Sequence, residues 1–114
     1  MKIKFKDGTE FKVASIKKNV DHNTFFNNKL NNTTVVLNIN ENDKPVITVE
    51  YLEELLTPEI VSEVTFVREG GENFVESYER FARITQNIDD YGNQIFIVLS
   101  KDKYVADPPE GASI

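Results

Sequence analysis

The side chains that could carry acid or base chemistry begin with His22, the only histidine of the chain. It lies in the tripeptide DHN, and no serine or cysteine accompanies it in a spacing typical of a nucleophile and its base. An acid or a base also needs neighbours that orient it. We therefore expect His22 to be an exposed side chain without a catalytic role.

Paired carboxylates are the second candidates for chemistry, because two of them can act as the acid and the base of a glycoside hydrolase. Such pairs occur at Glu53 with Glu54, Asp89 with Asp90, and Glu69 with Glu72. A hydrolase also needs a cleft between its carboxylates, which a short chain rich in strands is not expected to form. We interpret these residues as hydrated positions of a helix and of turns.

Metal and cofactor sites have few residues to build on. Without cysteine the chain can form neither a disulfide framework nor a thiolate metal site. The aspartates do not follow the DxDxDG pattern of a calcium loop, and Gly70-Gly71 has no lysine at phosphate-loop spacing. We expect no catalytic residue, no metal and no cofactor, and hence a protein that is not an enzyme.

Length and composition limit the remaining classes. The 114 residues suit one domain, and 39% hydrophobic residues are somewhat few for a deep core, which fits a thin fold or a homo-oligomer. A net charge of -6 repels a phosphate backbone, so we expect no direct nucleic-acid binding. No apolar run approaches the about 20 residues of a membrane span. The segment MKIKFKDG has no apolar core of a signal peptide, so we expect no membrane insertion and no secretion by such a signal.

The elements that would position an interaction surface begin with a β-hairpin. Residues 2–6, KIKFK, alternate polar and apolar side chains, and Asp7-Gly8 is a pair favoured in tight turns. Ile16 breaks the two-residue period, which predicts a bulge or a strand end near Ser15. The buried face of the hairpin is expected to consist of Ile3, Phe5, Phe11 and Val13.

Residues 17–32 are dense in asparagine, whose side chain competes with regular backbone pairing, and we predict a long loop there. The loop contains Phe25 and Phe26, which either fold back on the sheet or stay exposed for a partner. Residues 33–40 alternate again and predict a half-buried strand.

A short helix is predicted near residues 49–57. Three leucines within residues 52–56 have helical spacing, and Thr48 is a suitable N-cap. Pro58 has to end this helix, because residues before proline avoid helical backbone angles. Thr57 can then cap one further turn that begins with the proline.

The second half of the chain predicts further strands. Residues 64–68 suit a strand that ends in a hairpin turn at EGGE. Residues 73–88 fit either a helical stripe or strands, and we favour two short strands with a break near residues 77–80, because a hairpin turn has to connect two strands. The apolar run IFIVL at residues 95–99 predicts a central strand. Residues 102–114, with their Pro-Pro pair, predict a flexible tail.

These elements predict an α+β fold that is mostly antiparallel β. It has about six or seven strands in hairpins and one short helix near residues 49–57 packed on the sheet. We expect one β-rich domain over residues 1–101, with the Asn-rich loop at 17–32, followed by the tail at 102–114.

The order of four motifs carries a resemblance. They are DGTEFKV in the first hairpin, YLEELLTPEIVSEVTF, SYERFARI, and the final strand GNQIFIVLSK. In this order they resemble a group of small proteins encoded in phage and prophage genomes of Gram-positive bacteria, often near tail and baseplate genes. The likeness spans residues 1–101, and the Asn-rich stretch and the Pro-rich tail depart from it. The resemblance implies a place in the bacterial cytoplasm or in the virion, and it transfers no catalytic residue.

Two functions follow from this resemblance, and in both the partner is another protein. The first is a structural or assembly module of a phage tail or baseplate, which docks through sheet edges and the exposed face of residues 51–56. The alternative is an anti-defence inhibitor of the anti-CRISPR type, which binds a host nuclease and blocks a nucleic-acid site with its acidic face. The side chains expected to contact a partner are Phe25, Phe26, Glu50, Glu53, Glu54, Glu59, Glu63, Glu69, Glu72, Glu76 and Glu79.

Overall fold

The structure is a computed structural model that describes residues 1–23, 28–40, 42, 46–90 and 92–101, with only the backbone for residues 19–23 and 28–31. This part of the chain contains eight strands and two short helices. The strands are β1 (Lys2–Lys4), β2 (Glu10–Lys12), β3 (Ser15–Asn23), β4 (Asn28–Asn38), β5 (Val64–Val67), β6 (Phe74–Glu76), β7 (Arg80–Asp89) and β8 (Gly92–Ser100). The helices are α1 (Val49–Leu55) and α2 (Pro58–Val61).

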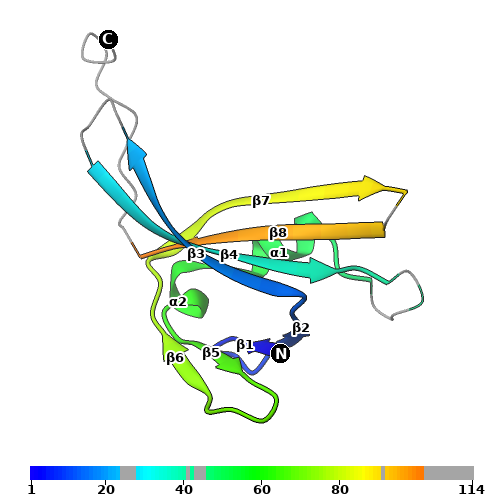
Figure 1. Ribbon diagram of the computed structural model, residues 1–114, viewed down its shortest axis with the longest axis horizontal. Helices are drawn as coiled ribbons and strands as arrows, with labels where there is room; N and C mark the ends of the chain where they lie inside the picture. Colours follow the sequence, from blue (N-terminus) through cyan, green and yellow to red (C-terminus); the bar gives the residue numbers. More distant parts are fainter. Residues whose placement is uncertain (24–27, 41, 43–45, 91, 102–114) are drawn as a thin grey trace, which may run out of the picture.

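The strands form two sheets of four strands each. Sheet A has the order β2-β1-β5-β6 and sheet B the order β3-β4-β8-β7, and all neighbours are antiparallel. Figure 1 shows the two sheets as separate layers, with α2 drawn between them. The predicted class, α+β with mostly antiparallel strands, is confirmed. The expected six or seven strands are corrected to eight in the described part of the chain.

The first hairpin forms as predicted. Its turn is closed by a hydrogen bond of 2.9 Å from the N–H of Gly8 to the carbonyl of Phe5. Gly8 has a φ of 92°, which glycine adopts without the strain that a Cβ would cause. Ile3 lies opposite Phe11 in the register of the two strands. Of the four apolar residues expected on the inner face, three are buried and Phe11 is half-buried.

The break in period at Ile16 marks the passage of the chain from one sheet to the other. β2 ends at Lys12, and the N–H of Ala14 already bonds to the carbonyl of Val36 in sheet B, over 2.8 Å. β3 begins at the next residue, Ser15. A strand does end in this region, but at Lys12, three residues before the predicted position, and Ser15 begins the next strand because the chain changes sheet there.

The loop predicted over residues 17–32 is wrong. β3 and β4 pair with each other as far as Asn23 opposite Asn28. The pairing starts inside the sheet, where Ile16 lies opposite Val35 and both pack with the core. Once a ladder is anchored at one end, each further pair needs only backbone N–H and C=O groups. The asparagine content therefore did not decide the backbone conformation.

The helix expected near residues 49–57 is present as α1, and a second helix follows it. The hydroxyl of Thr48 accepts a hydrogen bond of 3.1 Å from the N–H of Tyr51, which caps α1. α2 begins at Pro58, and its cap is Thr57. The predicted stop and the predicted second cap are both confirmed, so the single expected helix is corrected to two.

Residues 73–88 form strands, and the helical alternative is wrong. β6 and β7 are separated by residues 77–79, where the break was predicted, although β7 runs for 10 residues and is not short. β8 contains the IFIVL run and lies between β4 and β7, so it is central as expected.

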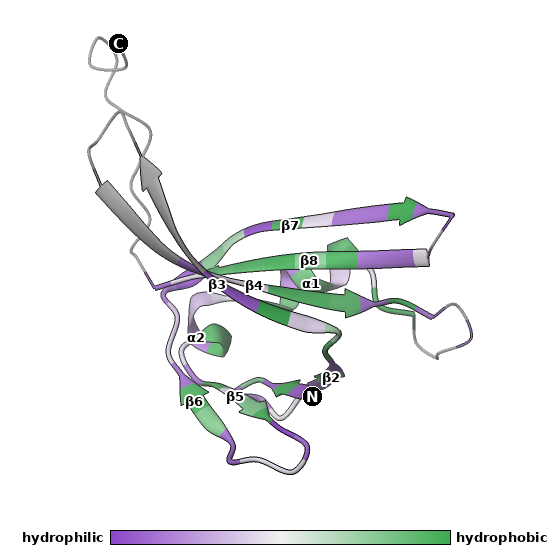
Figure 2. Cartoon of the chain, viewed as in Figure 1, coloured by the Kyte–Doolittle hydropathy of each residue, from purple (hydrophilic) through white to green (hydrophobic). Residues whose placement is uncertain are grey.

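One hydrophobic core joins both sheets and both helices. Its buried members are Ile3, Phe5, Val13, Val35, Leu37, Leu52, Leu56, Val61, Val64, Phe66, Tyr78, Ile95, Ile97 and Leu99. α1 and α2 both contact β7. Figure 2 shows that β7 and β8 become mostly hydrophilic toward the turn that connects them. The core therefore lies where the helices meet the sheets and does not extend to that turn.

A buried tyrosine ties the two sheets to each other. Tyr78 lies between β6 and β7, is 2% exposed, and donates from its hydroxyl to Oγ1 of Thr33 on β4 over 2.9 Å. Its N–H bonds to the carbonyl of Val61, the last residue of α2, over 3.0 Å. The link between β6 and β7 is thereby fixed to sheet B and to α2.

The described helices are both too short to cross a membrane. The tail predicted over residues 102–114 lies outside the described residues.

Candidate functional site

An apolar groove lies beside β2, between that strand and the segment that leads into α1. Its volume is about 460 Å³, and it is lined by Glu10, Phe11, Val46, Ile47 and Tyr51. We call it the Tyr51 groove. The groove adjoins an edge of sheet A, because β2 is the first strand of that sheet.

Aromatic rings hold the Tyr51 groove in shape. The ring of Phe11 meets the ring of Phe5 at 5.9 Å and the ring of Tyr51 at 6.5 Å, both edge-to-face. This geometry is favourable for aromatic pairs. Tyr51 is nevertheless 43% exposed, and Val46 is 40% exposed. The groove therefore exposes apolar side chains to solvent, and the contacts between the aromatic rings hold Phe11 and Tyr51 in place.

The two helices and the residues that follow them carry exposed carboxylates, of which Glu50 adjoins Tyr51 of the groove and Glu63 lines a separate depression. Glu50, Glu53 and Glu54 of α1 are all exposed. Glu59 and Glu63, in and after α2, are exposed as well. No lysine or arginine occurs in the sequence over residues 45–67, so these five charges are not neutralised by a neighbour along the chain. We call residues 50–63 the acidic segment.

Glu76 differs from the other predicted contacts, because it is mostly buried and pairs with two lysines, whereas Glu69 is exposed and lies 4.0 Å from the N-terminal amino group. Its carboxylate bonds to Nζ of Lys18 over 2.8 Å and to Nζ of Lys101, and its side chain is 15% exposed. The hydrogen bonds from Lys101 and then Lys18 lower the pKa of the Glu76 carboxyl below its ordinary value. Lys18 belongs to β3 and Lys101 follows β8, so Glu76 joins the edge of sheet A to sheet B. We call this contact between the two sheets the β6 joint, and Glu76 is a structural residue of it.

The other predicted contacts are spread over the surface. Glu69 and Glu72 are exposed in the turn between β5 and β6, and Glu79 is exposed before β7. They belong to other elements than the acidic segment. Phe25 and Phe26 lie outside the described residues.

A second surface feature was missed by the sequence reasoning. The outer face of sheet A carries Lys2 and Lys4, with Lys12 opposite Lys2 and Glu10 opposite Lys4. In the described residues no carboxylate lies within 4.0 Å of the Nζ of these lysines. The alternation KIKFK already placed the lysines on one face, opposite Ile3, so this signal was present in the sequence.

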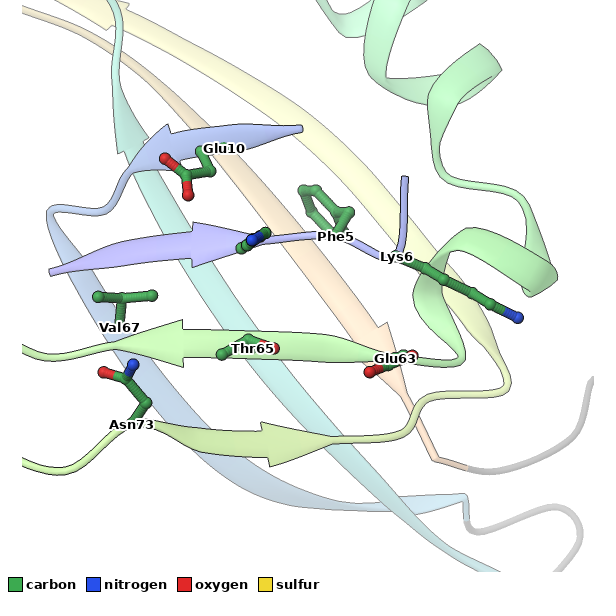
Figure 3. Close-up of a pocket in the computed structure, with 8 residues that line it drawn as sticks. Phe5, Lys6, Glu10, Glu63, Thr65, Val67 and Asn73 are labelled. Atoms are coloured by element: carbon green, nitrogen blue, oxygen red, sulfur yellow. The ribbon is translucent and has the colours of Figure 1, made fainter. Parts of the chain in front are cut away.

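A polar depression of about 400 Å³ lies on this outer face, and Figure 3 shows its lining side chains. Thr65 and Val67 come from β5 and Glu10 from β2, and Asn73 precedes β6. Glu10 lines both this depression and the Tyr51 groove. The charged face and the apolar groove therefore meet at β2.

Among the described residues, no three His, Cys, Asp or Glu side chains come together as a metal site requires. No protein-family model matches the chain, and no match was found among curated proteins or solved structures. The resemblance to phage-encoded proteins therefore stays a prediction that rests on the order of the motifs.

Proposed function

We propose that the protein is a non-enzymatic interaction module that works by binding another protein, as a structural or assembly component of a phage tail or baseplate. The observation that carries the binding part is the Tyr51 groove, an apolar surface that stays open in the isolated chain. The phage context is supported by the order of motifs described above.

The groove has the properties of a protein-binding surface. Interfaces are centred on buried aromatic side chains, and tyrosine is among the residues that contribute most to binding. Covering the exposed parts of Tyr51 and Val46, which are 43% and 40% exposed, stabilises a complex by roughly 1 kcal/mol each before the costs of association. The carboxylates of the acidic segment beside it favour a partner that places basic side chains around an apolar anchor.

The test is copurification from cells in which the phage genes are expressed. A tagged chain is expected to retain virion proteins, and Tyr51→Ala is expected to reduce that retention about tenfold or more, as for a central interface residue. Val75→Ala is the matched control, because Val75 is 62% exposed on β6, outside the groove. Equal retention by the chain and by Tyr51→Ala would contradict the role of the groove.

A second function is favoured by the acidic segment. Five carboxylates without an intervening basic residue could occupy the site where a host nuclease holds a phosphate backbone. Copurification with a host nuclease, lost when Glu50, Glu53 and Glu54 are changed to glutamine, would support the inhibitor. Copurification with virion proteins alone would exclude it and favour the assembly module.

A further inference from the structure

The hydrogen bonds of the first hairpin show which way the backbone of β2 faces. Phe5 directly follows β1, and Thr9 directly precedes β2. The N–H of Phe5 bonds to the carbonyl of Thr9 over 2.9 Å, so the backbone of Thr9 faces β1. Residues of an antiparallel strand bond alternately to the neighbours on either side. Glu10 and Lys12 therefore direct their N–H and C=O groups away from β1, to the open edge of sheet A. Within the described ranges, no hydrogen bond to these backbone groups is found.

The sequence of β2 is complementary to itself. The strand consists of Glu10, Phe11 and Lys12. If two copies pair antiparallel about a two-fold axis at Phe11, Glu10 of each copy lies opposite Lys12 of the other. These are the residues whose backbone groups face outward, so each such pair can exchange two backbone hydrogen bonds. Opposite charges directly across such a pair stabilise it.

We propose that two copies of the protein associate through their β2 edges, so that both copies of sheet A become one continuous sheet with a two-fold axis at Phe11. The proposal rests on the proposed function, because it takes the Tyr51 groove as a protein-binding surface and names a second copy of the chain, as a neighbouring subunit of the same assembly, as its occupant. Two-fold dimers are the commonest symmetric assemblies, and an open strand edge is a ready template for pairing.

The association accounts for the exposed apolar residues beside β2. The Phe11 residues of the two copies face each other as a pair without backbone hydrogen bonds, in which side chains approach most closely. The two Tyr51 grooves then lie next to each other across the axis, because Phe11 lines each groove. Tyr51 and Val46, exposed in one copy, are covered by the other.

The association also resolves an unfavourable pair of charges. Within one chain Lys12 lies opposite Lys2, and like charges directly across two strands destabilise a sheet. In the dimer Lys12 gains Glu10 of the second copy on its other side. This carboxylate beside Lys12 offsets part of the repulsion between Lys12 and Lys2.

The opposite edge of sheet A lacks these properties. Two copies of β6 paired about Val75 would place Phe74 opposite Glu76, which gives no charge complementarity. Glu76 is also engaged with Lys18 and Lys101 in its own chain. Of the two edges of sheet A, β2 is therefore the one suited to this dimer.

Charge reversal at β2 tests the proposal by sedimentation velocity across a range of protein concentrations. The wild-type chain is expected to dimerise. Lys12→Glu alone and Glu10→Lys alone each place like charges opposite one another twice, and each is expected to raise the dissociation constant roughly tenfold or more. The double variant Glu10→Lys with Lys12→Glu restores both pairs and is expected to dimerise again.

Sedimentation velocity of a mixture of Lys12→Glu and Glu10→Lys is the most discriminating experiment. One strand then carries two acidic and the other two basic residues around Phe11, so the two variants are expected to form a heterodimer with a lower dissociation constant than the homodimer of either. Circular dichroism of each variant checks that it is folded. A monomeric wild type, dimerisation unaffected by either reversal, or a mixture that stays monomeric would each overturn the proposal.

The outcomes separate this proposal from the proposed function. A monomeric chain that still retains virion proteins through Tyr51 overturns the dimer and leaves the assembly module standing. A β2-dependent dimer that retains no virion protein supports the dimer and contradicts the tail or baseplate role.

Discussion

The hydrogen bond between Tyr78 and Thr33 makes a prediction that can be worked out from the structure. The tyrosine hydroxyl donates to Oγ1 of Thr33 over 2.9 Å, and the two residues are 2% and 3% exposed. Tyr78→Phe removes the donor and keeps the ring that packs in the core. The variant should therefore fold to the same structure with a lower free energy of unfolding.

The magnitude follows from the burial of the partner. A net hydrogen bond contributes about 1 kcal/mol, and a buried hydroxyl left without a partner costs about 1–3 kcal/mol. Because Thr33 is 3% exposed, water cannot easily replace the tyrosine. We expect Tyr78→Phe to lower the free energy of unfolding by about 2 kcal/mol. Adding Thr33→Val removes the orphaned hydroxyl and should recover about half of that loss or more.

The same side chain makes stability depend on alkaline pH. Burial raises the pKa of Tyr78 from its ordinary value of 10.0 to about 12. The contribution of the group is complete below pH 10, and it is lost as the pH rises from about 10 to about 12, because the unfolded chain releases the proton first. At roughly 1.4 kcal/mol per pH unit, the loss is about 2–3 kcal/mol. Tyr78→Phe removes this part of the pH dependence.

Urea unfolding of the four chains in this cycle, at pH 7 and at pH 11.5, measures both effects. The four are the wild type, Tyr78→Phe, Thr33→Val and the double variant. At pH 7 the cycle should show a coupling between the two positions. The stability difference between the wild type and Tyr78→Phe should shrink at pH 11.5. Equal stability of the wild type and Tyr78→Phe at pH 7, or additive losses in the cycle, would refute the reasoning.

Two further predictions concern the β6 joint, where Glu76 pairs with Lys18 and Lys101, and the hydrophobic core. Glu76→Gln should lower the free energy of unfolding by about 1 kcal/mol near neutral pH, because it removes the charge that Lys18 and Lys101 share. Since the pKa of Glu76 is lowered in the folded chain, its contribution to stability is present above the ordinary value of 4.5 and is lost as the pH falls through the folded pKa. Glu76→Gln should therefore lose less stability on acidification than the wild type. Urea unfolding at several pH values measures this, and Glu79→Gln, at an exposed position, is the control. Leu52→Ala empties a fully buried position of α1 and should cost about 2–5 kcal/mol in thermal or urea unfolding, whereas Glu53→Ala on the exposed side of the same helix should change stability by less than about 0.5 kcal/mol.

Local chemistry made part of the fold predictable. Thr48 and Thr57 were identified as caps from their own positions, because a cap bonds to a residue only three places along the chain. Gly8 was predictable for the same reason, since a tight turn involves adjacent residues. Pairings between distant segments were not predictable in this way. Ile3 lies opposite Phe66 in sheet A, and no local signal states that choice.

The Tyr51 groove shows the same division. The exposed face of the helix at Tyr51 was predicted from helical spacing, but the groove also needs Phe11, which belongs to a different element. The acidic residues were predicted by type, and only the structure separates Glu76, which is paired within the chain, from the exposed carboxylates. Composition records the number of charges and does not record which of them are already neutralised.

The two edges of sheet A differ in their bonding: the β6 edge is bonded within the chain, and the β2 edge is open. Folding stability and dimer formation can therefore be changed independently by substitution. At the β6 edge, Glu76 bonds to Lys18 and Lys101 of the sheet B region. Just beyond that edge, Tyr78 bonds to Thr33. The β2 edge, at the other end of the sheet order, keeps its outward backbone groups without a bond in the described chain. A substitution at the β6 joint should therefore lower the free energy of unfolding and leave the dissociation constant of the proposed dimer unchanged. Charge reversal at β2 should raise that dissociation constant and leave the free energy of unfolding of the single chain unchanged.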